Sequence, residues 1–173
     1  MAQTETAHAT NFFLDGNFAP VSDERDAQDM PVLGEIPKDL VGHFLRVGPN
    51  PAHIFNEAAY HTFDGDGMIH AMTFSEGSAH YRNRFVQTEG FKLEQAHGGW
   101  LYKGMNSMMD PTPSELPSGA PKNKNLANTA FAYHNKTLYA LHEPSQPTII
   151  DLPELTTQGA TNFDGKLKHP FTA

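Results

Sequence analysis

Histidine and carboxylate side chains must hold any metal ion in this chain, because its 173 residues contain no cysteine. The absence of cysteine also excludes disulfide bonds, thiolate metal sites and cysteine nucleophiles. Four of the 10 histidines lie close together in sequence: His53, His61, His70 and His80. No two of them have the four-residue spacing of a metal-binding pair on a helix. We expect them to be ordinary strand and turn residues, and no four-ligand metal site from this chain alone.

Two aspartates and two glycines alternate in the run Asp64-Gly65-Asp66-Gly67. We expect a tight turn in which the glycines take positive φ and both carboxylates accept hydrogen bonds from nearby backbone amides. An EF-hand calcium loop is the alternative. Counting from Asp64, however, places Ile69 where that loop needs glycine, and no glutamate closes the loop. The run therefore predicts a turn and not a calcium site.

The residues after this turn predict a β-hairpin. Met68–Phe74 is rich in strand-forming residues, Ser75–Gly77 is a short connection, and Ser78–Val86 is the return strand. A connection near Glu76 places His80 in the neighbourhood of Met72.

The remainder of the chain predicts more short antiparallel strands. Residues 126–133, 137–142 and 148–151 are β-rich, whereas 109–124 contains four prolines and predicts a long loop. With 14 glycines and 13 prolines, the chain leaves no room for a long amphipathic helix. We predict an all-β fold, but periodicity does not choose among a sandwich, a barrel and a propeller.

Charge and hydropathy exclude several classes. Twelve basic and 20 acidic residues give a net charge of −8, which repels phosphate backbones, so no nucleic-acid partner is expected. The N-terminus has no basic and apolar signal sequence, and no run of 18 apolar residues occurs. We expect a cytoplasmic protein with a flexible N-terminus (residues 1–10) and one domain over residues 11–173.

Five motifs occur in an order that resembles one enzyme family. They are Leu40–Pro51, Tyr60–His70, Tyr81–Val86, the pair Asn128–Ala130 with Leu138–Glu143, and Phe163–Ala173. Together they resemble the carotenoid cleavage oxygenases, also called the retinal pigment epithelial membrane protein family. The resemblance covers nearly everything from Asn11 to the end of the chain.

This resemblance implies a seven-bladed β-propeller with a helical cap and a non-haem ferrous ion (Fe2+) on its axis. Four histidines from different blades would hold the ion and leave positions open for O2. A lipophilic polyene would enter through an apolar tunnel, and a double bond would be split into two carbonyl products. In such enzymes the metal supplies the reactivity and the protein supplies position.

The resemblance also implies that this chain lacks the metal ligands. The first ligand would directly follow Ala173, so we expect an N-terminal fragment of a longer enzyme, with an incomplete propeller and no catalytic residue. His169 falls before the ligand position and is expected not to bind metal. Because unpaired blades leave apolar faces uncovered, the isolated chain is expected to be inactive and to aggregate or stay partly unfolded.

Several residues have roles implied by the resemblance. Glu143 matches a glutamate that hydrogen-bonds the second nitrogen of an iron-bound histidine. His142 and Met108 are possible tunnel residues, and Met105 and Met109 are further thioethers that could line it. Arg46 is expected to connect loops through hydrogen bonds. Trp100 is expected in the core.

Three other functions remain open at the level of sequence. A stilbene-cleaving dioxygenase of the same family is one, because residues 162–167 also resemble that branch. A non-catalytic β-module that binds lipophilic ligands is the second, and a retinoid-type isomerase is the third. Peripheral membrane contact is possible by analogy, although no amphipathic helix is expected to carry it.

Overall fold

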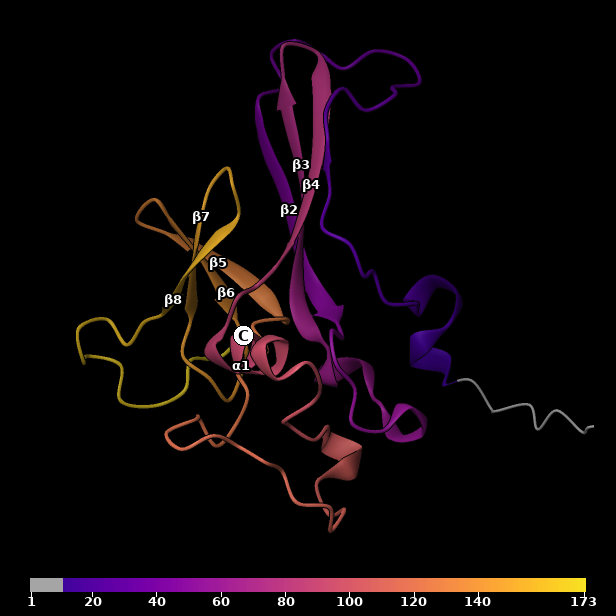
Figure 1. Ribbon diagram of the computed structural model, residues 1–173. Helices are drawn as coiled ribbons and strands as arrows, with labels where there is room; N and C mark the ends of the chain where they lie inside the picture. Colours follow the sequence, from indigo (N-terminus) through magenta and orange to yellow (C-terminus); the bar gives the residue numbers. More distant parts are fainter. Residues whose placement is uncertain (1–10) are drawn as a thin grey trace, which may run out of the picture.

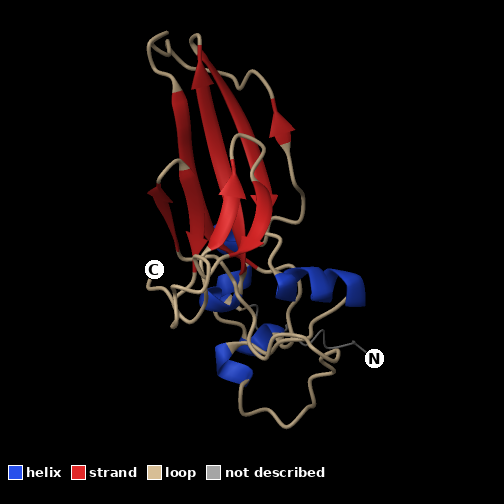
Figure 2. Ribbon diagram, turned by 90° about the vertical axis from the view of Figure 1, so that its left-hand side faces the viewer, coloured by secondary structure: helices blue, strands red, loops and turns tan. Residues whose placement is uncertain are grey.

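The computed structural model describes residues 11–173, so the predicted flexible N-terminus lies outside the described residues. Two four-stranded antiparallel sheets and one α-helix make up the regular structure. The strands gather at one end of the molecule, and the helix, the 3-10 turns and the longest loops gather at the other (Figure 2). The prediction of a β-rich fold is confirmed, with one helix added.

The first sheet has the order β1-β4-β3-β2. Its strands are β1 (Asp26–Ala27), β2 (Gly42–Asn50), β3 (Asp66–Ser75) and β4 (Ser78–Phe85). The predicted hairpin is confirmed as β3 and β4, but β3 begins inside the predicted turn. His80 lies opposite Thr73, next to the expected Met72, whereas His70 lies opposite Asn83. The three long strands form an arm that extends away from the rest of the molecule (Figure 1).

The second sheet is a meander in the order β5-β6-β7-β8. Its strands are β5 (Ala130–His134), β6 (Thr137–Leu141), β7 (Thr148–Asp151) and β8 (Thr156–Ala160). The expected hairpin is present, and its two-residue turn places Asn135 and Lys136 at φ of 47° and 62°. Strand β8 was not predicted.

The expectation that residues 126–129 continue strand β5 is wrong. Leu126 and Asn128 bond toward the first sheet instead: Gly67 N donates to Leu126 O at 2.8 Å, and Asn128 Nδ2 donates to Gly65 O at 2.7 Å. Thr129 N donates to Leu141 O of β6 at 3.1 Å, so the return to the second sheet begins there. This crossing segment therefore joins the second sheet to the acidic turn of the first.

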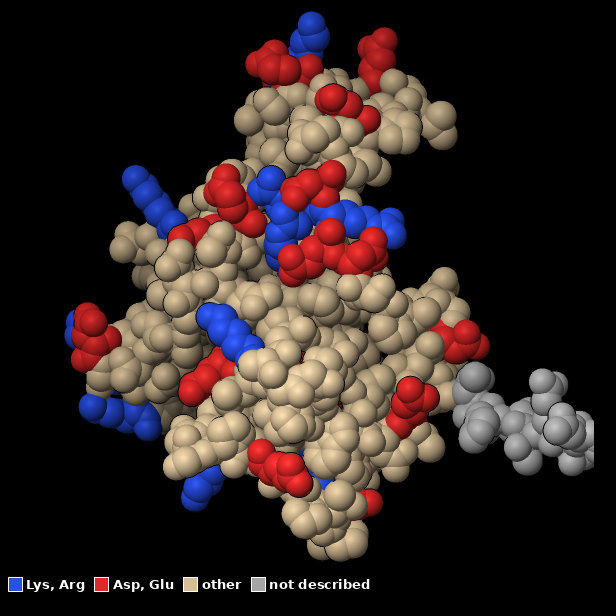
Figure 3. Space-filling model, viewed as in Figure 1, with Lys and Arg blue, Asp and Glu red and all other residues tan. Residues whose placement is uncertain are grey.

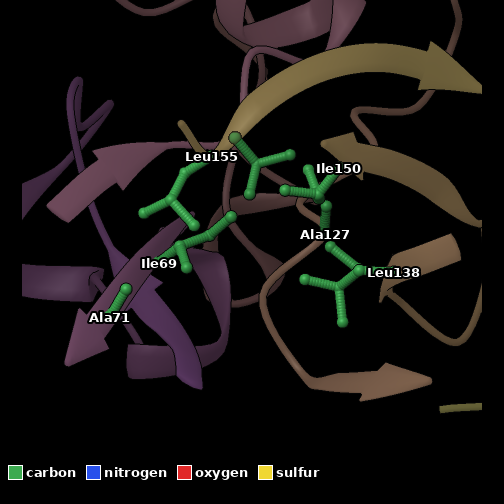
Figure 4. Packing of buried hydrophobic residues seen from close by; sticks show 8 residues of the cluster. Ile69, Ala71, Ala127, Leu138, Ile150 and Leu155 are labelled. Carbon is green, nitrogen blue, oxygen red and sulfur yellow. The ribbon is translucent and has the colours of Figure 1, made fainter. Parts of the chain in front are cut away.

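The main core lies between the two sheets. Ile69 and Ala71, alternate residues on one face of β3, pack in the same cluster as Leu138 and Ile150 from the second sheet. Figure 4 shows these side chains pointing toward one another, with the crossing-segment residue Ala127 among them. Because successive strand residues face opposite sides, the intervening residues of β3 point away from this core.

Helix α1 (Glu89–His97) was not predicted, although the sequence carries both of its end signals. Thr88 accepts a hydrogen bond from Phe91 N as the N-cap, and Gly98 ends the helix in the left-handed conformation at φ 76°. Buried Phe91 packs with Met68 and Phe85 in a second apolar cluster. That contact fixes α1 against the first sheet.

Short 3-10 turns complete the described structure: η1 (Phe12–Leu14), η2 (Gly16–Phe18), η3 (Glu57–Ala59), η4 (Thr62–Asp64) and η5 (Met105–Ser107). The predicted long loop over residues 109–124 is confirmed, since no helix or strand occurs there. No helix among residues 11–173 is long and apolar enough to cross a bilayer.

An ion-pair group fixes β1 beside β4. Asp26 pairs with both Arg82 and Arg84, and Arg84 also lies 3.8 Å from Glu24. Lys and Arg side chains are intermingled with Asp and Glu across the middle of the face in Figure 3. Exposed pairs of this kind each contribute little to stability, so the group is better understood as setting the position of β1.

Candidate functional site

The two glycines of the acidic turn allow other backbone segments to approach closely, and they do not adopt unusual backbone angles. The prediction of positive φ is wrong: Gly65 has φ −69°, and Gly67 is also outside the positive region. A Cβ on Gly65 would lie 2.7 Å from Asn50 N, and a Cβ on Gly67 would overlap the carbonyl of Ala127. Glycine is therefore needed because other backbone passes directly over the turn.

The aspartates of the turn accept backbone hydrogen bonds, as predicted. Asp64 accepts from Met105 N at 2.8 Å and from His61 N at 3.2 Å, and Asp66 accepts from Ala52 N at 3.2 Å. These partners lie up to 41 positions away in sequence. The turn therefore positions several loops at once.

Three buried charges lie beside this turn and form what we call the ionic triad: Asp66, Glu94 and Lys124. The Lys124 ammonium lies 2.5 Å from Asp66 Oδ1 and 2.5 Å from Glu94 Oε2. The side chains of Lys124, Asp66 and Glu94 are 8%, 3% and 2% exposed. Burial raises the pKa of Asp66, and the charge of Lys124 opposes that rise. Two almost fully buried carboxylates thus share one ammonium, and Glu94 and Lys124 also form part of the cavity lining.

A cavity of about 960 Å³ opens next to the triad at the loop-rich end of the molecule. Its walls come from β2, the loops around η3, η4 and η5, the long loop, the crossing segment and the end of β6. The apolar part of the lining includes Phe55, Phe63, Leu101, Leu116 and Met108. The volume falls within the usual range for small-molecule sites, and the mixed lining fits a large, mostly apolar ligand.

Glu143 lies on the rim of this cavity and is exposed. Its Oε2 lies 3.3 Å from Thr129 Oγ1, whose one hydroxyl proton is shared between Glu143 and Asn128 Oδ1 at 3.0 Å. Within the described residues, this is the one hydrogen bond that its carboxylate makes. The remaining carboxylate oxygen is therefore available to accept a further hydrogen bond from a group at the cavity mouth.

His142 lines the cavity and is half-buried. Its Nδ1 accepts a hydrogen bond from Leu126 N at 3.3 Å and lies 3.0 Å from Ser145 Oγ. A nitrogen that accepts cannot carry a proton, so the neutral ring has its hydrogen on Nε2. Burial lowers the pKa of His142, and the carboxylate of Glu143 acts in the opposite direction.

We predict that His142 titrates below its unfolded pKa of about 6.5. The folded state then binds fewer protons than the unfolded state, so the stability contribution of the neutral ring is present above pH 6.5. It is lost as the pH falls through 6.5 toward the lower folded pKa. Nitrogen-15 NMR of the ring should show the Nε2-H tautomer and a depressed titration midpoint. An Nδ1-H tautomer or a normal midpoint would contradict this prediction.

The methionines divide between the cavity and the surface. Met105 and Met108 line the cavity while remaining 48% and 72% exposed, whereas Met109 is 95% exposed and is not part of the lining. Trp100 packs edge-to-face on the lining residue Phe55, with ring centroids 4.4 Å apart. Trp100 is partly buried and belongs to neither apolar cluster, so the expectation that it lies in the core is wrong, and it packs on the cavity wall through Phe55.

Arg46 does not have the expected hydrogen bonds. In the described part of the chain its guanidinium is exposed and forms none, because β2 presents it at the cavity edge instead of between loops. It lies opposite His70 in the sheet, where burial and the charge of Arg46 lower the pKa of His70. Arg46 is thus a rim residue.

The four neighbouring histidines do not gather. His53 contacts Gln95, His61 caps η4, His70 contacts Tyr81, and His80 lies in β4. Across residues 11–173 no group of three or more His, Asp or Glu side chains is arranged to hold a metal ion. The described residues therefore do not form an iron site by themselves.

His169 lies in the exposed C-terminal segment, where its ring contacts Pro170 O at 3.0 Å. Two positions later, Phe171 N donates to Ser145 O at 3.0 Å. That bond holds the C-terminal segment beside Ser145, which is two residues from Glu143.

Comparison with known proteins decides the family. The family model for the retinal pigment epithelial membrane protein matches residues 18–173. The chain belongs to this family. The resemblance drawn from the five motifs is confirmed.

Curated relatives in this family include enzymes of carotenoid cleavage. The chain is 39% identical to carotenoid 9,10(9',10')-cleavage dioxygenase 1 of Arabidopsis thaliana over 93% of its own length and 32% of that protein. It is 35% identical to a carotenoid cleavage oxygenase of Mycobacterium tuberculosis, covering all of this chain and 32% of that protein. The chain thus spans about a third of the length of these relatives.

Solved family structures show the same partial match. The lignostilbene dioxygenase of Pseudomonas brassicacearum aligns with a TM-score of 0.81 at 31% identity, over 93% of this chain and 33% of that one. Cobalt-substituted Synechocystis apocarotenoid oxygenase aligns with a TM-score of 0.71 at 33% identity, over 87% and 32%. The prediction of an incomplete β-propeller is confirmed, since the two sheets match part of these propeller-containing oxygenases.

The main functional features that sequence reasoning missed are the ionic triad and the pairing of Thr129 with Glu143. Asp66 was assigned to a turn, and Glu94 and Lys124 carried no local signal. In the sequence, Glu94 and Lys124 are each a single charged residue near apolar ones. Charged residues of this kind normally lie on the protein surface.

Proposed function

We propose that this chain is the N-terminal part of a longer Fe(II)-dependent dioxygenase that cleaves a double bond of carotenoids or apocarotenoids. The cavity carries this proposal, because a large and partly apolar space is bordered by a carboxylate with a free oxygen. A conjugated polyene fits such a lining. The iron, when bound, would supply activation of O2, and one oxygen atom would enter each of the two carbonyl products.

In this proposal Glu143 orients a metal-binding histidine that lies outside the chain. A carboxylate that accepts from the second ring nitrogen fixes the ring and increases its basicity. The bond between Phe171 and Ser145 supports the assignment, because residues that follow the C-terminal segment would pass close to Glu143. His142 and Met108 would contact the polyene from the cavity wall.

Engineered structures of a relative alter a threonine and a glutamate with the spacing of Thr129 and Glu143. Variants of the Synechocystis enzyme replace a threonine in one structure and a glutamate in others. In that protein the two positions have the same separation as Thr129 and Glu143. We infer that both residues belong to the rim that faces the reaction centre.

A stilbene substrate is the second candidate, because a lignostilbene dioxygenase aligns with this chain at a TM-score of 0.81. It would be cleaved by the same chemistry at its central double bond. Contact with a membrane surface, from which a carotenoid could be withdrawn, stays a prediction.

Substrate assays on the longer protein separate these possibilities. Purified protein loaded with ferrous iron is given a carotenoid, an apocarotenoid or a hydroxystilbene, and aldehyde products are identified by mass spectrometry. We expect aldehydes from at least one of the two polyenes, and their loss when iron is removed by a chelator. Cleavage of the stilbene alone would favour the second candidate, and no cleavage of any substrate would contradict the proposal.

A further inference from the structure

The ionic triad connects three separate segments at one point beside the cavity. Asp66 begins β3, Glu94 lies in α1, and Lys124 ends the long loop. Glu94 Oε1 also accepts from Leu101 N at 2.8 Å and from Tyr102 N at 3.0 Å. Residues 101–124, which we call the wall segment, are therefore held at both ends by a single group of charges.

The wall segment is held at these two ends and at one further place, where Met105 N donates to Asp64 Oδ1 and Asn106 Nδ2 donates to Ala59 O. Tyr102 Oη donates to Pro121 O at 3.0 Å, which closes the base of the segment. Between residues 111 and 120 the hydrogen bonds are local, within Asp110–Thr112 and Pro117–Ala120. That stretch is mostly exposed, yet it contributes Ser114 and Leu116 to the cavity lining.

The lysine also has little freedom to move. A Cβ added at Gly90 would lie 2.7 Å from Lys124 Cγ, so the lysine stem packs directly on the backbone of α1. Both carboxylates that face the ammonium are almost fully buried. Buried ion pairs are weak sources of net stability, and well-packed apolar residues often replace them without loss. A role in fixing one conformation is the better explanation of this arrangement.

We propose that Lys124 is a positioning residue, which holds the wall segment at the spacing required for a polyene in the cavity. The identification of the ligand as a polyene rests on the proposed function. The role of Lys124 in holding the wall segment is independent of that function. Without the ammonium, two buried carboxylates would face each other unpaired, and the bond from Tyr102 Oη to Pro121 O would have to hold the ends of the wall segment together against their repulsion.

The test uses a Lys124→Met variant of the longer protein, since methionine keeps most of the stem and removes the charge. Hydrogen exchange of residues 101–123 is expected to accelerate by about tenfold or more, while strand β6 keeps its protection. The conjugated polyene parinaric acid, detected by its fluorescence in an apolar site, is expected to bind about tenfold more weakly. Lys92→Met, which changes an exposed lysine on α1, is the matched control and should behave as wild type.

Unchanged exchange and unchanged probe binding in Lys124→Met would overturn the proposal. Loss of protection in β6 as well would mean that Lys124→Met unfolds more than the wall segment. A triple variant, Lys124→Met with Asp66→Asn and Glu94→Gln, then tests the proposal, because it removes every charge of the triad. The proposal requires the triple variant to fold and the hydrogen exchange of its wall segment to remain faster than in the wild type. A wall segment that exchanges at the wild-type rate in this variant would overturn the proposal. If the wild-type protein binds no parinaric acid, the polyene assignment fails, while the exchange result still decides the role of Lys124.

Discussion

Replacing Gly67 by alanine is expected to destabilise the protein by about 3 kcal/mol, at the upper end of the usual cost of overpacking. The added Cβ would overlap the backbone carbonyl of Ala127 and lie 2.8 Å from Leu126 O. Backbone on both sides is fixed, because Gly67 N donates to Leu126 O and Val86 N donates to Gly67 O. Moving Leu126 away would break the bond between the crossing segment and β3, and moving Gly67 away would break its bond to Val86 at the end of β4.

Denaturant unfolding of the longer protein measures this effect. Gly48→Ala is the matched control, since Gly48 lies opposite Met68 on the adjacent strand and a Cβ there meets nothing within 4 Å. Alanine in a strand interior is otherwise slightly favourable relative to glycine, so the control should lose no stability. Equal unfolding midpoints for Gly67→Ala and Gly48→Ala would show that the close approach at Gly67 is unimportant.

Replacing Glu143 by glutamine is expected to lower iron affinity or kcat/KM by about 10- to 100-fold in the longer protein. Glutamine keeps the size and the contact with Thr129 but loses the negative charge that orients a metal-binding imidazole. The protein should still fold, because Glu143 is exposed and makes one hydrogen bond within the described chain. Iron content by metal analysis and steady-state kinetics are the two measurements.

Glu154→Gln supplies the control for this prediction, as it changes an exposed glutamate on the surface beyond β7. Glu143→Asp keeps the charge on a shorter side chain and should fall between the glutamine variant and wild type. Full iron content together with full activity in Glu143→Gln would exclude the orienting role. That result would leave the dioxygenase assignment to be judged by the substrate assays.

The two hairpins show which parts of the fold the local sequence predicts. Strand-forming residues with a turn between them predicted both the β3–β4 and the β5–β6 pair, and each strand ends within a few residues of its expected position. The capping residues of α1 were present but overlooked, because a nine-residue helix has too few positions for a strong periodic pattern. The five motifs together indicated the family, and the match of the family model confirmed it.

Local sequence determined strands β3 to β7, the turns of the two hairpins and the family, since these depend on neighbours within about ten residues of one another. Strands β1, β2 and β8 were not predicted from it. Tertiary structure alone decided that backbone passes too close to Gly67 for any side chain, that residues 126–128 cross to the first sheet, and that Lys124 lies between Asp66 and Glu94. Those contacts join residues 30 or more positions apart. They exist only after two sheets and a helix have packed, so no window of the chain contains the information by itself.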